Sequence, residues 1–163
     1  EMAIQWLKDA GLIYQVNRVS APGMPLKFYS DMAVFKLFVL DIGLMGAMVD
    51  APAESILVAD TLFREYKGAF TELFVLTQLM PLGLPIYYFS SNDSRVEIDL
   101  IVQHGNTITP VEVKAEENVH AKSLRTFISK HPQLKGLRLS MKPYQDQEWM
   151  TNKPLYAVGA WLK

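Results

Sequence analysis

The feature that most constrains the fold of this chain is a pair of alternating segments on either side of a two-residue turn signal. Residues 96–102 read Val-Glu-Ile-Asp-Leu-Ile-Val, residues 111–114 read Val-Glu-Val-Lys, and Gly105-Asn106 lies between them. Acidic and apolar residues that alternate in this way are typical of a strand with two unlike faces, and a Gly-Asn pair favours a tight hairpin turn. The pattern predicts an antiparallel hairpin.

The length of the turn sets the register of this hairpin. If the turn consists of Gly-Asn alone, Asp99 lies opposite Glu112 and Glu97 lies opposite Lys114. We expect these four side chains to share one face, and the apolar residues Ile98, Leu100, Val111 and Val113 to cover the other. Opposed carboxylates repel each other unless a cation lies between them, and Mg²⁺ takes one or two carboxylates together with water. The face is therefore either a metal site or a solvated acidic surface.

A helix predicted over residues 60–80 carries one carboxylate on an apolar stripe. Glu72 has Val75, Leu76 and Leu79 as neighbours at helical spacing. A lone carboxylate in such a setting costs roughly several kcal/mol unless it is paired or binds a metal. We expect Glu72 to bind a metal ion with the hairpin acids, to meet an Arg or Lys, or to reach solvent.

The rest of the chain predicts an α/β protein in two parts. Residues 1–50 contain a predicted helix at 2–10 and strands at 12–19 and 26–29, an arrangement of a partial winged helix or of an ordinary helix and hairpin. Pro52 marks the predicted boundary. From residue 54 to residue 163 the predicted order is helix, three strands, helix, strand and a C-terminal element.

Two shorter stretches of the first part are also informative. Residues 35–40 form an apolar run that fits either a buried strand or a helix. Asp41 is the expected N-cap of a short helix that ends near Met48.

Composition narrows the class of protein. The chain of 163 residues is 50% apolar, has a formal net charge of −1 and contains no cysteine. The apolar content and low net charge argue against disorder. The absence of cysteine excludes disulfides, zinc–thiolate sites and thiol catalysis, and no apolar run approaches the ~20 residues of a membrane helix. We expect a cytoplasmic protein without a membrane partner, and a helix that starts almost at Glu1 suggests a piece cut from a longer chain.

An acid on a helix, an Asp on the next hairpin and a Glu-x-Lys on the following strand resemble the PD-(D/E)XK nuclease superfamily. Here these residues are Glu72, Asp99 and Glu112-Val113-Lys114. The wider pattern resembles a prokaryotic family of uncharacterised domains attached C-terminal to an AAA-type P-loop ATPase. It comprises residues 68–75, 97–101, 110–114, 122–124 and 154–157.

The resemblance implies a restriction-endonuclease-like core, in which helices flank a mixed central sheet. Asp99 and Glu112 would hold Mg²⁺, Glu72 would bind metal or orient water, and Lys114 would steady the attacking hydroxide or the charge on phosphorus. The implied function is Mg²⁺-dependent phosphodiester hydrolysis or DNA association by the C-terminal domain of the ATPase. The alternative is a nuclease fold that does not cut and that regulates the ATPase, with oligomer contacts, so the enzyme assignment stays open.

Charge does not by itself favour a DNA partner. The chain has 16 Lys and Arg against 17 Asp and Glu, whereas phosphate backbones attract basic surfaces. Lys122 and Arg125, on the helix after the Glu-x-Lys strand, either contact phosphates or form a solvated face. A third interpretation, a nucleic-acid-binding winged helix, is weaker because its supposed recognition helix carries only Lys8 as a base. No P-loop motif is present, so the ATPase itself lies outside this sequence.

Overall fold

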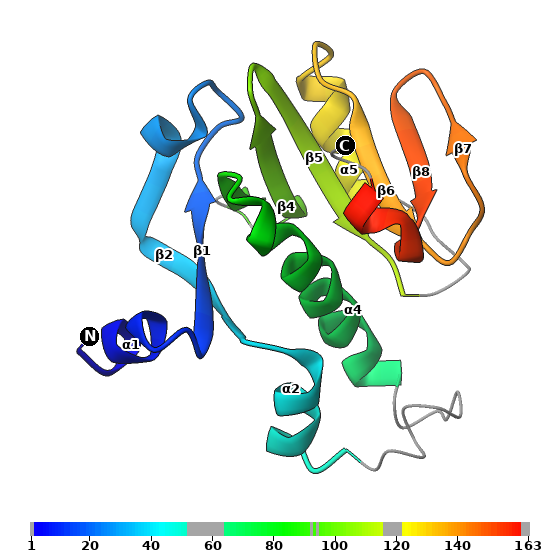
Figure 1. Ribbon diagram of the computed structural model, residues 1–163. Helices are drawn as coiled ribbons and strands as arrows, with labels where there is room; N and C mark the ends of the chain where they lie inside the picture. Colours follow the sequence, from blue (N-terminus) through cyan, green and yellow to red (C-terminus); the bar gives the residue numbers. More distant parts are fainter. Residues whose placement is uncertain (1, 52–63, 92, 94, 116–121, 161–163) are drawn as a thin grey trace.

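The computed structural model describes residues 2–51, 64–91, 93, 95–115 and 122–160, and these residues build one mixed sheet with helices packed against it (Figure 1). The described helices are α1 (Met2–Asp9), α2 (Ile42–Met48), α4 (Arg64–Leu79) and α5 (Lys122–Lys130), with 3-10 turns η1 (Leu26–Tyr29), η3 (Met80–Leu82) and η4 (Leu155–Ala160). The described strands are β1 (Ile13–Val19), β2 (Ser30–Val39), β3 (Ile86–Ser90), β4 (Glu97–His104), β5 (Thr107–Val113), β6 (Gly136–Ser140), β7 (Gln145–Asp146) and β8 (Met150–Pro154). The predicted α/β class, a mixed sheet with helices, is confirmed.

The eight described strands follow the order β2-β1-β3-β4-β5-β6-β8-β7. Neighbouring strands are parallel at β1–β3, β5–β6 and β6–β8 and antiparallel elsewhere. The sheet thus runs across the boundary predicted near residue 50, because β1 and β2 precede it and β3 follows it. None of the described helices is long and apolar enough to span a bilayer.

The N-terminal hairpin extends the central sheet instead of standing out as a wing. Arg18 and Val19 of β1 pair with Tyr88 and Phe89 of β3, and α1 buries none of its side chains. The strand predicted at 26–29 is wrong, since these residues form η1 and the strand begins at Ser30. Long-range contacts hold this turn, because Leu26 is fully buried and its N–H donates to Gln103 Oε1 at 2.9 Å.

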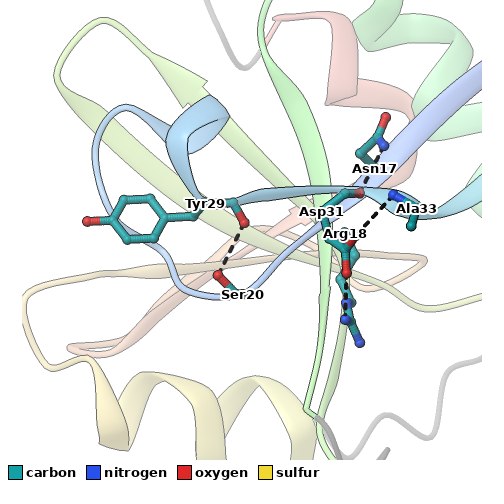
Figure 2. Close-up of polar contacts among 6 residues, drawn as sticks. All are labelled: Asn17, Arg18, Ser20, Tyr29, Asp31 and Ala33. Atoms are coloured by element: carbon teal, nitrogen blue, oxygen red, sulfur yellow. Dashed lines mark hydrogen bonds and ion pairs between the residues drawn. The ribbon is translucent and has the colours of Figure 1, made fainter.

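A bulge in β2 sets the register between β1 and β2. Asn17 pairs with Phe35 but Arg18 pairs with Asp31, so the residues between them loop out of the ladder. Asp31 closes this loop: one carboxylate oxygen accepts from Ala33 N–H, the other from Arg18 at 2.9 Å, and its carbonyl accepts from Asn17 (Figure 2). As a result, Lys36 lies opposite Val16.

Two apolar cores lie on the two faces of the sheet. The α4-side core includes Val75, Leu76 and Leu79 of α4 with Val16, Tyr88, Leu100, Val102, Val111, Val113, Leu137 and Leu139. The α5-side core includes Leu124, Phe127 and Ile128 of α5 with Val19, Leu26, Ile98, Ile101, Ile108 and Met150. Because each buried aliphatic side chain contributes roughly 2 kcal/mol, these two cores hold the helices to the sheet.

Local signals at the ends of elements behave as predicted. Asp41 Oδ1 accepts from Leu44 N–H at 2.8 Å and caps α2. The α4 helix and its 3-10 extension end at Gly83, which has a positive φ of 66°. The apolar run at 35–40 lies mainly in β2, which settles the choice between strand and helix. The start of the helix predicted at 60–80 lies outside the described residues.

Candidate functional site

The hairpin of β4 and β5 has the predicted turn and, as far as its ladder extends, the predicted register, whereas the expected pairs Asp99–Glu112 and Glu97–Lys114 lie beyond the last ladder pair. Pairs run from His104 opposite Thr107 to Leu100 opposite Val111, and Gly105 takes a positive φ of 56° in the turn. At the far end of this hairpin lie Glu97 and Asp99, near the start of β4, and Glu112 and Lys114, near the end of β5. The candidate site is built there.

A bulge in β4 changes which side chains share a face. Ile101 pairs with Tyr87 and Ile98 with Phe89, so Asp99 and Leu100 together oppose Tyr88. Leu100 then belongs to the α4-side core and Ile98 to the α5-side core. The expectation that Ile98, Leu100, Val111 and Val113 cover one face is therefore wrong for Ile98.

Glu112 lies on the α5 side of the sheet. It alternates with Val111 and Val113, both in the α4-side core, and its Oε2 accepts from the Leu124 N–H of α5 at 3.1 Å. Its Oε1 lies 2.7 Å from Lys114 Nζ. Glu97, which precedes the α5-side residue Ile98, lies on the α4 side, so the four hairpin charges do not all share one face.

Glu72 meets a lysine, one of the three outcomes expected for it. Lys36 Nζ lies 3.2 Å from Glu72 Oε1 and 2.7 Å from Glu97 Oε1. The same ammonium lies 5.0 Å from the centroid of the Tyr88 ring. Glu97 therefore pairs with Lys36 and not with Lys114. Lys36 was missed at the sequence level, although a single cation inside the apolar run Val34-Phe35-Lys36-Leu37-Phe38 was a signal that it needs a buried partner.

Asp99 connects the two halves of the site. Its Oδ2 accepts from the Val113 N–H at 2.7 Å. Burial raises the pKa of Asp99 to about 7; the Val113 hydrogen bond and Lys114 oppose this rise, and the charges of Glu72 and Glu112 add to it. A carboxyl with such a pKa exchanges its proton near neutral pH.

Burial and charged neighbours also shift the pKa values of Glu72, Lys36 and Lys114. Burial raises the pKa of Glu72, and the ammonium of Lys36 opposes that rise. Burial alone would lower the pKa of Lys36 and of Lys114, but the carboxylates around each outweigh it and raise both values. We call the six residues Lys36, Glu72, Glu97, Asp99, Glu112 and Lys114 the carboxylate–lysine cluster. With every group ionised, its four acids and two lysines carry a formal charge of −2, and the buried guanidinium of Arg138, which pairs with Glu112 across β5 and β6, adds a positive charge beside it.

The donor atoms of the cluster suit a hard divalent cation such as Mg²⁺, which prefers carboxylate oxygens. Among the described residues, Asp99 Oδ1 and Glu72 Oε2 accept no protein hydrogen bond, so both oxygens are available as metal ligands. No three acidic or histidine side chains in the described part of the chain converge closely enough to hold a metal ion as they stand.

The predicted phosphate contacts lie on the exposed face of α5. Lys122 and Arg125 are both exposed, and the Arg125 guanidinium lies 5.9 Å from the Trp149 ring centroid. Lys122 opens the described part of α5, two residues before the amide that binds Glu112. The two cations are thus on the helix that contacts the cluster, outside the cluster itself.

Fold and site together define an α/β domain whose mixed sheet carries a cluster of carboxylates and lysines at one end of a hairpin. Residues 67–157 match the family described as "Domain of unknown function (DUF4143)", and because this match covers more than half of the chain, the chain belongs to that family. Residues 1–55 match a second family, "Domain of unknown function (DUF8612)". No curated protein and no solved structure is significantly similar to the chain.

The two matches divide the cluster unequally. Lys36 lies in the segment 1–55, whereas Glu72, Glu97, Asp99, Glu112 and Lys114 lie in the segment 67–157. The β1–β3 pairing joins both segments in one sheet. The site is consequently shared between two segments that match different families.

Proposed function

We propose that this chain is a nuclease-like domain with a restriction-endonuclease-like core, which hydrolyses phosphodiester bonds of DNA with Mg²⁺ as the C-terminal domain of an AAA-type ATPase. One observation carries the proposal. Glu72 of α4, Asp99 of β4, and Glu112 and Lys114 at the end of β5 act on one another electrostatically in a single cluster. Groups whose pKa values are strongly perturbed by burial and by specific charged neighbours are typical of functional sites.

Each residue would have a distinct role in this reaction. Asp99 and Glu112 would hold the Mg²⁺ ion, which, when bound, lowers the pKa of a water molecule and offsets charge on phosphate oxygens. Glu72 would orient the attacking water and accept its proton. Lys114 would place its ammonium near the charge that develops on the phosphoryl group.

The charge balance supports a cation at this place. The four carboxylates of the cluster outnumber its two lysines and the neighbouring Arg138 guanidinium by one, and a divalent ion relieves the repulsion among them. Exposed cations on α5, Lys122 and Arg125, would meet the DNA backbone beside the site.

The experiment combines calorimetric titration of Mg²⁺ and Mn²⁺ with cleavage of supercoiled plasmid and single-stranded DNA. We expect Glu112→Gln to lose both metal binding and cleavage, and Lys114→Met to keep metal binding but to lose cleavage by about 100-fold. The matched control is Glu148→Gln, which changes an exposed carboxylate outside the cluster and should behave as wild type. A wild-type chain that gives no heat with either ion and leaves DNA intact would overturn the proposal.

A second candidate function is favoured by the contacts that the acids already make. Both oxygens of Glu112 are engaged, one by the Leu124 N–H and one by Lys114, and Glu72 is engaged by Lys36. These contacts suit a nuclease fold that no longer cuts and that regulates the ATPase through protein contacts. In that case the wild type binds the metal ion but leaves DNA intact, and Glu112→Gln loses the metal binding. In the full-length protein the same variant changes the rate of ATP hydrolysis.

A further inference from the structure

Lys36 occupies the space between two carboxylates that come from different elements. Its ammonium lies 3.2 Å from an oxygen of Glu72 on α4 and 2.7 Å from an oxygen of Glu97 on β4. The contact with Glu97 has the length of a charge-assisted hydrogen bond, and the contact with Glu72 is at the long end of an ordinary one. One cation therefore links the helix acid to the hairpin acid.

The backbone and the neighbouring ring fix the position of this ammonium. Lys36 pairs with Val16 in the β1–β2 ladder, and Val16 is buried in the α4-side core, so the lysine side chain lies on the α4 side. The face of the Tyr88 ring lies 5.0 Å from Nζ and adds a favourable cation–π contact. The lysine side chain is 27% exposed, and that of Glu72 20%, so water screens the pair only in part.

Without this ammonium, Glu72 and Glu97 would face each other as two negative charges, and the charge of Glu97 already acts to raise the pKa of Glu72. Such a pair needs a cation, and the cation present is part of the chain. An ammonium that contacts both carboxylates also repels any metal ion that approaches the same oxygens.

We infer that Lys36 is the resident cation of the carboxylate–lysine cluster: it holds Glu72 in position and takes the place of a second divalent ion between Glu72 and Glu97. The inference rests on the proposed function for the first Mg²⁺ ion, at Asp99 and Glu112. The position of the Lys36 ammonium between Glu72 and Glu97 does not depend on that function. Two-metal phosphodiesterases place two ions about 4 Å apart to stabilise both the attacking and the leaving oxygen. Here a lysine supplied by the N-terminal segment would serve as the second positive centre, so the site takes one divalent ion.

The test counts bound Mn²⁺ in the full chain by calorimetry and by electron paramagnetic resonance. Lys36→Met removes the charge and keeps much of the length of the side chain, and Lys36→Arg keeps the charge. Lys8→Met is the matched control, because Lys8 bonds to Gln15 and, within the part of the chain that the structure describes, to no acid. We expect one ion for the wild type, for Lys36→Arg and for Lys8→Met. In Lys36→Met we expect a second ion, or one ion bound about tenfold more tightly.

The outcomes separate the two proposals. If the wild type and Lys36→Met bind one ion with the same affinity, the inference about Lys36 is wrong and the proposed metal site stands. If the wild type binds none and Lys36→Met binds one, Lys36 is the resident cation and the proposed Mg²⁺ site of the wild type is wrong. If neither binds an ion, both are wrong.

Two further variants control for misfolding of Lys36→Met and for the position of the ammonium. Circular dichroism and a thermal melt establish whether Lys36→Met is folded, and Lys36→Gln replaces it if it is not. The double variant Lys36→Met/Glu97→Gln removes one of the two acids and should lose the gain in Mn²⁺ binding. A gain that persists in the double variant would overturn the position assigned to the ammonium.

Discussion

Replacing Asp99 by Asn should make the chain more stable at alkaline pH, although it removes a charge from the candidate site. Asn stays neutral at every pH, and its carbonyl oxygen is placed to accept the Val113 N–H as Oδ2 of Asp99 does. The substitution therefore removes the cost of burying an ionised carboxylate and keeps the hydrogen bond.

The magnitude follows from the pKa of Asp99, which burial raises from 3.8 to about 7. Because each pH unit is worth about 1.4 kcal/mol, the ionised carboxylate costs at most roughly 4 kcal/mol above pH 7. Between pH 3.8 and about pH 7, Asp99 stays protonated in more of the folded chains than of the unfolded chains. The free energy of unfolding therefore falls as the pH rises through this range, and below this range Asp99 causes no loss of stability. About 3 kcal/mol of the difference between Asp99→Asn and the wild type should appear between pH 5 and pH 8.5.

Urea unfolding at pH 5 and pH 8.5, followed by tryptophan fluorescence in the presence of EDTA, measures this difference. Comparing variant with wild type at each pH cancels the titration of the groups that do not interact with Asp99. Asp9→Asn, an exposed change on α1, is the matched control and should leave the free energy of unfolding nearly unchanged at both pH values. A difference between Asp99→Asn and wild type that is the same at both pH values would refute the reasoning, because it would mean that Asp99 is ionised throughout.

Three further substitutions test the elements that support the site. Asp41→Ala removes the acceptor for the Leu44 N–H and should cost about 1 kcal/mol in urea unfolding, whereas Asp41→Asn should cost much less. Leu76→Ala, in the α4-side core at 0% exposure, should cost about 3 kcal/mol, and a loss below ~1 kcal/mol would mean that α4 is not packed on the sheet. Gly105→Ala places a side chain at a φ of 56° and should cost about 1–2 kcal/mol, with Gly68→Ala, in a helix with open space around it, as a control that should not destabilise.

The hairpin and its register were predictable from sequence because they depend on local interactions. A Gly in the turn accepts the positive φ that a two-residue connection needs, and the turn length then determines which residues of β4 and β5 face each other. The Asp41 cap followed for the same reason, since its hydrogen bond spans only three residues. Glu72 was singled out because a carboxylate on an apolar stripe needs a partner.

Which partner Glu72 finds was decided by the tertiary structure. Lys36 and Glu72 are 36 residues apart, and they meet only because β1 pairs with β3 and the bulge in β2 places Lys36 opposite Val16. The bulge in β4, which separates Ile98 from Leu100, likewise depends on the register with β3 and not on the residues of β4 alone. Turns and caps in this chain are determined by neighbours along the sequence. Strand pairing and burial across the whole sheet determine on which face the charged side chains meet, and hence the pKa of Asp99.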